Sequence, residues 1–136
     1  MAAPIPVSKT FWDGTRGMTR WYAAWASADQ LTDSVLVDVS ALAPAPTAVK
    51  VRSFDSIING DLQVDFEFDA TTDELIDRFA GQIDATEQIL RDYTDGPNSG
   101  YTPAQSETGF AGDILLSTSN AALGDELNVL VVFERA

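Results

Sequence analysis

The residues of this chain that could do chemistry are carboxylates set two positions apart. Asp65, Glu67 and Asp69 alternate with apolar residues, so they would stand in a row on one face of a β-strand. Several carboxylate oxygens at short range suit calcium, and a pair of carboxylates can hydrolyse glycosides. No spacing singles out a pair, however, and such a row is usually a solvated outer face. We therefore expect no catalytic residue and no metal site.

Other reactive groups are missing from the sequence. The chain has no cysteine and no histidine, which removes disulfides, thiolate chemistry and the commonest general base. Serines are plentiful, but no G-x-S-x-G turn is present to activate one. The segment from Asp92 to Gly96 lacks the 1-3-5 ligand spacing of a calcium loop. The sequence predicts a protein that is not an enzyme and that holds no cofactor.

The charge balance bears on possible partners. The 136 residues include 8 Lys and Arg against 21 Asp and Glu, a net charge of −13. Such a surface repels phosphate backbones, so we expect no direct nucleic-acid binding. The acidity can serve solubility alone, or it can dock onto a basic partner surface. No apolar run approaches the ~20 residues of a membrane-spanning helix, and the N-terminal residues do not resemble a signal peptide, so no membrane association is expected.

The N-terminal segment carries the candidate partner-binding residues. Two prolines near its start favour an extended arm without regular hydrogen bonding over residues 1–15. Phe11 and Trp12 are too apolar to be left in water, so either the body of the protein or a neighbouring molecule should cover them. With Arg16, which follows closely, they form the predicted partner-binding set.

Residues 16–26 are expected to form the first strand of the body. In a strand, Trp21, Ala23 and Trp25 share one face, and the residues between them point the other way. A helix over the same residues would also produce an aromatic stripe, and this alternative stays open. Aromatic content favours the strand. The two tryptophans are more typical of a core than of a binding site.

Three further segments alternate and predict strands. Over Ser34–Ser40 the three valines share a face, and over Ala48–Ile58 Val49 and Val51 are in phase. Asp61–Asp69 alternates strictly. Its residues predicted to face inward are Leu62, Val64, Phe66 and Phe68. Because Asn59-Gly60 is the strongest two-residue hairpin signal in the chain, the strands on either side of it are expected to pair.

Residues 72–93 are ambiguous. Apolar residues there approximate helical spacing, and good helix formers are common. Because the surrounding segments all predict strands, we expect short strands around 74–79 and 87–92 with a loop between them, and a helix remains the alternative. Residues 95–109 contain several glycines and prolines and are expected to form a long surface loop.

The C-terminal residues contain two β-rich runs. The first is Ile114–Leu116, and the second places Leu127, Val129, Val131 and Phe133 on one strand face. Serine, asparagine, glycine and aspartate lie between the runs, which predicts a hairpin-like pair. Six to eight short strands separated by turn signals indicate an all-β fold. We expect a single antiparallel β-sandwich domain over residues 16–136, jelly-roll-like in its arrangement.

Several strings occur in a fixed order along the chain. They are Trp12-Asp13-Gly14-Thr15-Arg16, Leu36-Val37-Asp38-Val39-Ser40-Ala41-Leu42, Asp69-Ala70-Thr71-Thr72, Gly109-Phe110-Ala111-Gly112-Asp113-Ile114-Leu115-Leu116-Ser117-Thr118, and Gly124-Asp125 before the final strand. In this order the strings resemble a family of small virion structural proteins of tailed bacteriophages, the capsid decoration or cement proteins. The resemblance spans about Phe11 to Arg135, and residues 81–108 depart from the family pattern.

The resemblance implies an all-β protein on the outer surface of the capsid, bound to the major capsid protein. It implies self-association as well, with a homotrimer at a symmetry axis of the shell, and no catalytic residues. Two other functions stay open. One is a tail, neck or fibre-associated protein of the same virion. The other is a carbohydrate-binding or carbohydrate-cleaving sandwich that would use Trp21, Trp25 and the acidic strand face.

Overall fold

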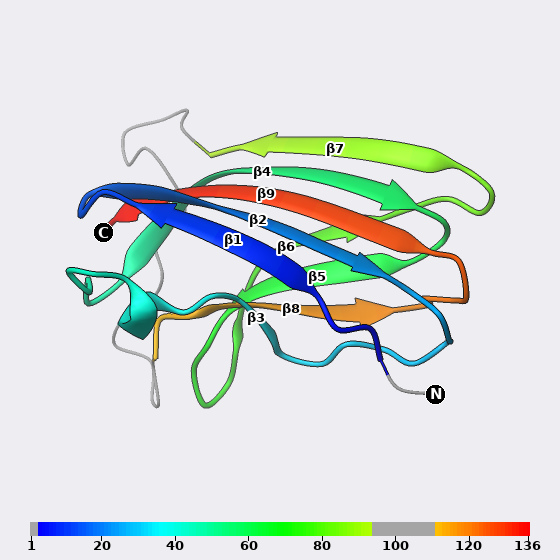
Figure 1. The fold of residues 1–136 in the computed structure, drawn as a ribbon, viewed down its shortest axis with the longest axis horizontal. Helices are drawn as coiled ribbons and strands as arrows, with labels where there is room; N and C mark the ends of the chain where they lie inside the picture. Colours follow the sequence, from blue (N-terminus) through cyan, green and yellow to red (C-terminus); the bar gives the residue numbers. More distant parts are fainter. Residues whose placement is uncertain (1–2, 94–110) are drawn as a thin grey trace.

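Nine strands and a short 3-10 helix make up the regular structure of the described residues (Figure 1). The computed structural model describes residues 3–93 and 111–136. The strands are β1 (Val7–Trp12), β2 (Arg16–Ala24), β3 (Ser34–Val37), β4 (Val49–Asn59), β5 (Gln63–Phe68), β6 (Glu74–Ala80), β7 (Thr86–Asp92), β8 (Ile114–Ser119) and β9 (Glu126–Arg135); the helix η1 is Val39–Ala41. No described helix is long and apolar enough to cross a membrane.

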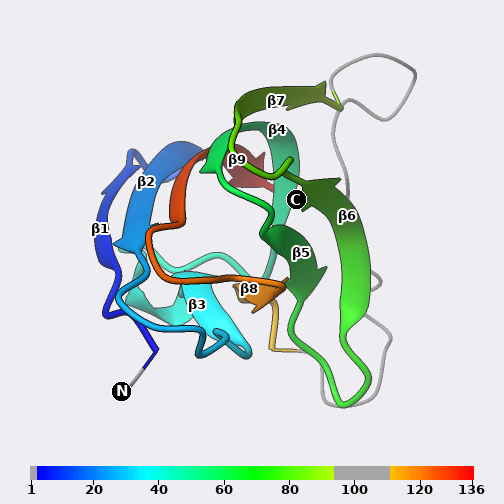
Figure 2. The ribbon, with the colours of Figure 1, turned by 90° about the vertical axis from the view of Figure 1, so that its right-hand side faces the viewer.

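The strands form two antiparallel sheets that pack face to face, which Figure 2 shows nearly end-on. One sheet has five strands in the order β1-β2-β9-β4-β7, and the other has four in the order β3-β8-β5-β6. Large apolar side chains fill the space between them. The expected antiparallel β-sandwich is confirmed.

Strand pairing follows a nested pattern. β5 pairs with β6, β4 with β7, β3 with β8 and β2 with β9. The chain from β2 to β9 therefore behaves as one long hairpin whose successive pairs lie in alternate sheets, which is the arrangement of a jelly roll. β1 adds to the free side of β2 as an edge strand.

Both predicted hairpins are wrong because of this nesting. β4 and β5, which Asn59-Gly60 joins, lie in different sheets, and so do β8 and β9. Gly60 does have the positive φ expected of the turn, +107°. The turn, however, carries the chain across the sandwich rather than back along the same sheet. The Gly60 N–H donates to the Ala85 carbonyl at 3.0 Å, so this crossing is held to the β6–β7 crossing beside it.

The alternation within strands is confirmed where it was strictest. The inward residues of β2, β5 and β9, and Leu62 just before β5, are buried as expected: Trp21, Ala23, Leu62, Val64, Phe66, Phe68, Leu127, Val129, Val131 and Phe133. At the centre Phe66 stacks on Phe54, with ring centroids 4.2 Å apart. Strands also form at β6 and β7, so the helix alternatives for residues 16–26 and 72–93 are wrong.

The strand expected over Ser34–Ser40 is shorter and changes phase. β3 ends at Val37, and a bulge separates Val35 from Val37 in the pairing with β8. As a result Val35 is 49% exposed while Val37 is buried. The helix η1 follows. Asp38 caps its N-terminal end, because the Asp38 side chain accepts a hydrogen bond of 3.0 Å from the Ser40 N–H.

The expected N-terminal arm is also wrong for residues 7–12. These residues pair with β2 from Val7 opposite Tyr22 to Trp12 opposite Gly17. The prolines that suggested an arm precede the strand, and the backbone of β2 offers a free edge to which residues 7–12 can bond. The loop expected over residues 95–109 lies outside the described residues.

Candidate interaction surface

The string Trp12-Asp13-Gly14-Thr15-Arg16 forms the turn between β1 and β2. The Asp13 carboxylate accepts hydrogen bonds from the N–H groups of Arg16 at 2.7 Å and Thr15 at 2.8 Å. These bonds lower the pKa of Asp13 below its usual value. Gly14 has a φ of +97°, and its carbonyl accepts two hydrogen bonds from the Arg135 guanidinium, at 3.1 and 3.0 Å. The turn is thus fixed to the end of β9.

Trp12 is anchored to its own chain. Its indole N–H donates to the Pro44 carbonyl at 3.0 Å, and its ring stacks on Phe133 with centroids 5.9 Å apart. The Arg135 guanidinium lies over the Trp12 ring, 5.8 Å from its centroid. Phe11 behaves differently: it points outward and is 52% exposed. The body of the protein therefore covers Trp12 and leaves Phe11 in solvent.

The structure brings the three predicted partner-binding residues together. Phe11, Trp12 and Arg16 line one shallow groove beside the β1–β2 turn, hereafter the Phe11 groove. Its floor is completed by Met18 and Val132, which stand opposite each other on β2 and β9. Met18 is 38% exposed and Arg16 keeps 74% of its side chain in solvent. An apolar groove edged by an exposed cation is a suitable contact surface for another protein.

Basic residues gather on the outer face of the five-stranded sheet. Five of the chain's eight basic residues lie there: Lys9, Arg16, Arg20, Lys50 and Arg52. Four acidic residues share this face: Asp55, Asp92, Glu126 and Glu134. The other described residues hold three basic and fifteen acidic side chains. In a protein of net charge −13, this one face is close to neutral.

Three of these cations converge on Glu134. Its carboxylate lies 3.6 Å from Arg16, 3.1 Å from Lys50 and 3.0 Å from Arg52. Burial alone would raise the pKa of Glu134, but the hydrogen bond from Lys50 and the charges of the three cations lower it overall. The Glu134 side chain is only 14% exposed. The cluster adjoins the Phe11 groove, with which it shares Arg16.

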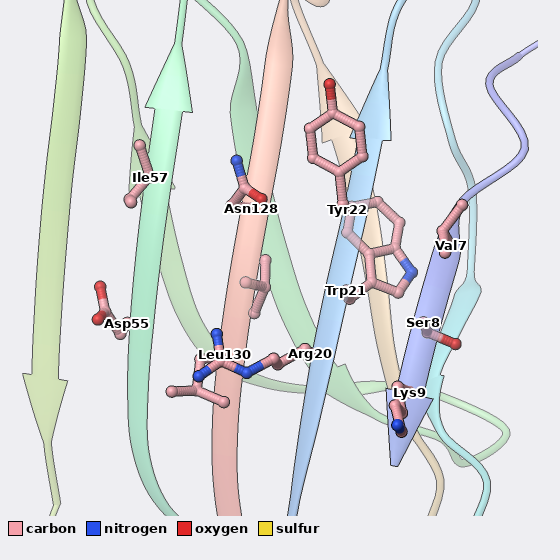
Figure 3. Close-up of a pocket in the computed structure, with 11 residues that line it drawn as sticks. Val7, Ser8, Lys9, Arg20, Trp21, Tyr22, Asp55, Ile57, Asn128 and Leu130 are labelled. Atoms are coloured by element: carbon pink, nitrogen blue, oxygen red, sulfur yellow. The ribbon is translucent and has the colours of Figure 1, made fainter.

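A second hollow on the same face lies over β1, β2, β9 and β4 (Figure 3). Its members include Lys9, Arg20 and Leu130, and in Figure 3 the Arg20 side chain lies across β9 beside Leu130. Tyr22 and Ile57 form its apolar border, 36% and 39% exposed. None of its lining residues belongs to the Phe11 groove.

The outer face of the four-stranded sheet is acidic. Asp65 is held by Arg78 through two hydrogen bonds of 2.6 and 2.9 Å. Glu67, Asp33 and Asp73 place carboxylate oxygens within 4.8 Å of one another. Desolvation raises the pKa of Glu67, and the neighbouring carboxylates raise it further. Three carboxylates at this separation can share a cation, but exposed acidic groups often lie this close without one.

The two tryptophans on which the carbohydrate-binding hypothesis relies are buried. Trp21 and Trp25 are 2% and 3% exposed, inside the core. The Trp25 indole N–H donates to the Asp29 carbonyl at 2.9 Å. Neither ring can stack on a sugar in this arrangement, so the use of these tryptophans for binding is wrong and their assignment to the core is confirmed.

Sequence reasoning missed several members of the interaction surface. Met18 could have been found, because it follows Arg16 by two positions on the face opposite Trp21. Val132, Lys50 and Arg52 had no such signal. They reach the surface only through the pairing of β9 with both β2 and β4, which no local pattern reveals.

Comparison with known proteins leaves the family open. No protein-family model matches the chain, and no curated protein matches it. A solved structure from Bacillus endospore appendages, described as a novel family of disulfide-linked pili, covers 98% of this chain and 91% of its own. The sequence identity is 6% and the TM-score is 0.41. Similarity at this level carries no argument about function.

Proposed function

We propose that this protein is a structural component of a tailed-bacteriophage virion that decorates or cements the outer surface of the capsid. In this role it binds the major capsid protein through the Phe11 groove and associates with copies of itself, as a homotrimer at a symmetry axis. The proposal starts from the sequence resemblance to small virion proteins. The observation that carries it further is the outward-facing apolar groove, edged by Arg16, at the turn formed by the first of the resembling strings.

The geometry of the groove suits a docking role. Phe11 and Met18 expose apolar area that folding has left uncovered, and covering such area stabilises a complex by about 25 cal/mol per Å² before the costs of association. The turn beneath it is fixed by hydrogen bonds to Asp13 and from Arg135. Because the backbone there is already ordered, little conformational entropy is lost when a partner binds. The jelly roll itself also serves lectins and cupins, so the fold adds nothing to the choice of function.

Co-sedimentation with capsid shells that lack this protein tests the proposal. Met18→Asp places a charge in the floor of the Phe11 groove and should abolish co-sedimentation, while the wild-type protein pellets with the shells. Ile83→Asp is the matched control, because Ile83 is 73% exposed in the β6–β7 turn at the opposite end of the sandwich. Equal pelleting of the two variants, or no pelleting of the wild-type protein, would contradict the proposal.

The copy number per particle distinguishes a head protein from one of the tail, neck or fibre. Gel densitometry of purified particles should give a number of copies comparable to that of the major capsid protein. A stoichiometry of only a few copies per particle would assign the protein to the neck or tail instead.

A further inference from the structure

The outer faces of the two sheets are complementary to each other. On the four-stranded sheet Val35, Glu67 and Leu75 lie in one row across the strands, with Leu115 between the first two. Val35 and Leu75 are 49% and 45% exposed, and carboxylates surround Glu67 on three sides. This face therefore presents exposed apolar side chains beside a group of carboxylates, of which Asp65 is paired with Arg78.

The hollow of Figure 3 presents the opposite combination. Among the described residues, neither Lys9 nor Arg20 has a carboxylate at ion-pair distance, whereas the cations beside Glu134 are paired. Lys9 and Arg20 stand opposite each other on β1 and β2, and Leu130 continues the row on β9. Exposed Tyr22 and Ile57 lie beside them. This hollow presents apolar side chains beside two cations that have no ion-pair partner among the described residues, and Asp55 is the carboxylate in its lining. Lys9 also lies over the Phe11 ring, 5.2 Å from its centroid.

We propose that the acidic face of one copy binds the hollow formed around Lys9 and Arg20 in the next copy. Charge complementarity and exposed apolar area on both faces select a second copy of this chain as the occupant. The contact joins two different surfaces, so it is heterologous and generates a ring or an open chain rather than a closed pair. It uses no residue of the Phe11 groove and does not depend on the proposed attachment to a shell.

The size of the smaller face sets the strength of this contact. Four strands about 4.8 Å apart and about six residues long cover roughly 19 Å by 20 Å, or about 400 Å² per copy. A standard stable interface buries about 800 Å² per partner. The contact is therefore weak in dilute solution and sensitive to salt. A larger fraction of it forms where copies are held close together, because their effective concentration is higher there.

Sedimentation velocity of the full chain, over rising protein concentration at low salt, tests the contact. The wild-type protein should form species larger than a dimer, and these should disappear when the salt concentration is raised. The cationic-face variant carries Lys9→Glu with Arg20→Glu, and the acidic-face variant carries Glu67→Lys with Leu75→Lys. Each variant alone should be monomeric, because its two faces now have the same sign. An equimolar mixture should recover assembly, because opposite faces meet again.

The outcomes separate this contact from its alternatives. A contact between two like faces would let one of the variants assemble alone as the wild-type protein does, and that result would overturn the proposal. A wild-type protein that stays monomeric at every concentration would overturn it as well. All four substituted side chains point outward, so thermal unfolding followed by circular dichroism should show folded variants. Shell co-sedimentation of the single variant Arg20→Glu is a separate readout, since Arg20 does not line the Phe11 groove and Lys9, which lies over the Phe11 ring, is kept.

Discussion

Two glutamates on opposite faces of the sandwich show how unevenly the protein distributes its charge. Glu134 on β9 has three cations around one carboxylate, and Glu67 on β5 has three carboxylates around it. The pKa of Glu134 is lowered and that of Glu67 is raised. Burial opposes ionisation in each case and is the largest cause of the raised pKa of Glu67, to which the neighbouring carboxylates add, whereas the cations around Glu134 reverse its effect. The net charge of −13 thus hides one balanced face and one strongly acidic face.

The comparison depends on the inward and outward alternation of β5, and the largest expected effect tests it. Phe66 is fully buried and stacks on Phe54. Phe66→Asp should unfold the domain, because it buries an unpaired charge at a cost above about 4 kcal/mol. Glu67→Lys, one position along and outward-facing, should cost little. Thermal unfolding would refute the alternation if the two variants melted at the same temperature.

Removing the carboxylate of Glu134 should be the next largest effect. Glu134→Gln keeps the shape of the side chain but leaves Arg16, Lys50 and Arg52 without their shared anion. We expect the free energy of unfolding to fall by roughly 1–2 kcal/mol at pH 7. Urea unfolding measures this change. An unchanged midpoint would mean that the three ion pairs contribute nothing to the folded state.

The same substitution on the acidic face should act in the opposite direction. Glu67→Gln removes one charge from a group of repelling carboxylates, so the protein should be stabilised by roughly 0.2–1 kcal/mol at pH 7. The urea midpoint should therefore rise with an unchanged slope. A fall in the midpoint would show that a neighbour, such as a bound cation, stabilises the ionised form of Glu67, and that repulsion from the surrounding carboxylates does not dominate.

The pH dependence of stability should distinguish Glu67 from Glu134, and this is the smallest of the expected effects. The ordinary pKa of both carboxyls is 4.5. Because the folded pKa of Glu67 is raised, its penalty is complete above that raised value and fades as the pH falls to 4.5. Because the folded pKa of Glu134 is lowered, its contribution is complete above 4.5 and is lost only as the pH falls further, through the lowered value.

Melting temperatures of both variants and the wild-type protein, measured in steps from pH 7 to pH 3, check this order. The advantage of Glu67→Gln should vanish first on acidification, and the deficit of Glu134→Gln should vanish at lower pH. The reverse order would contradict the assignment of the two environments.

The sequence predicted local features of the fold and missed those that depend on strand pairing. The alternation of apolar and polar residues along β5 and β9 involves only consecutive residues, so the sequence predicts Phe66 and Phe133 in the core. The nested pairing of β2 with β9 joins residues more than a hundred positions apart, and nearest-neighbour reasoning replaced it with two hairpins that do not form. Gly60 has the positive φ that an Asn-Gly turn uses, yet a positive φ serves a hairpin and a sheet crossing equally well.

The candidate site shows the same limit. Phe11, Trp12 and Arg16 are close in sequence, so the sequence alone groups them. Their neighbour Val132 comes from β9 and joins them only through the register with β2. The bulge in β3 exposed Val35, which a strict alternation had placed in phase with Val37. Pairing and bulges arise from packing of the whole sandwich, and no short pattern encodes them.

A reconstruction of purified particles that contain this protein tests the proposed function most directly. We predict ordered copies on the outside of the capsid, with the β1–β2 turn and Phe11 buried against the major capsid protein. Particles whose capsid surface lacks the protein, or copies that hold Phe11 toward solvent, would contradict the proposal.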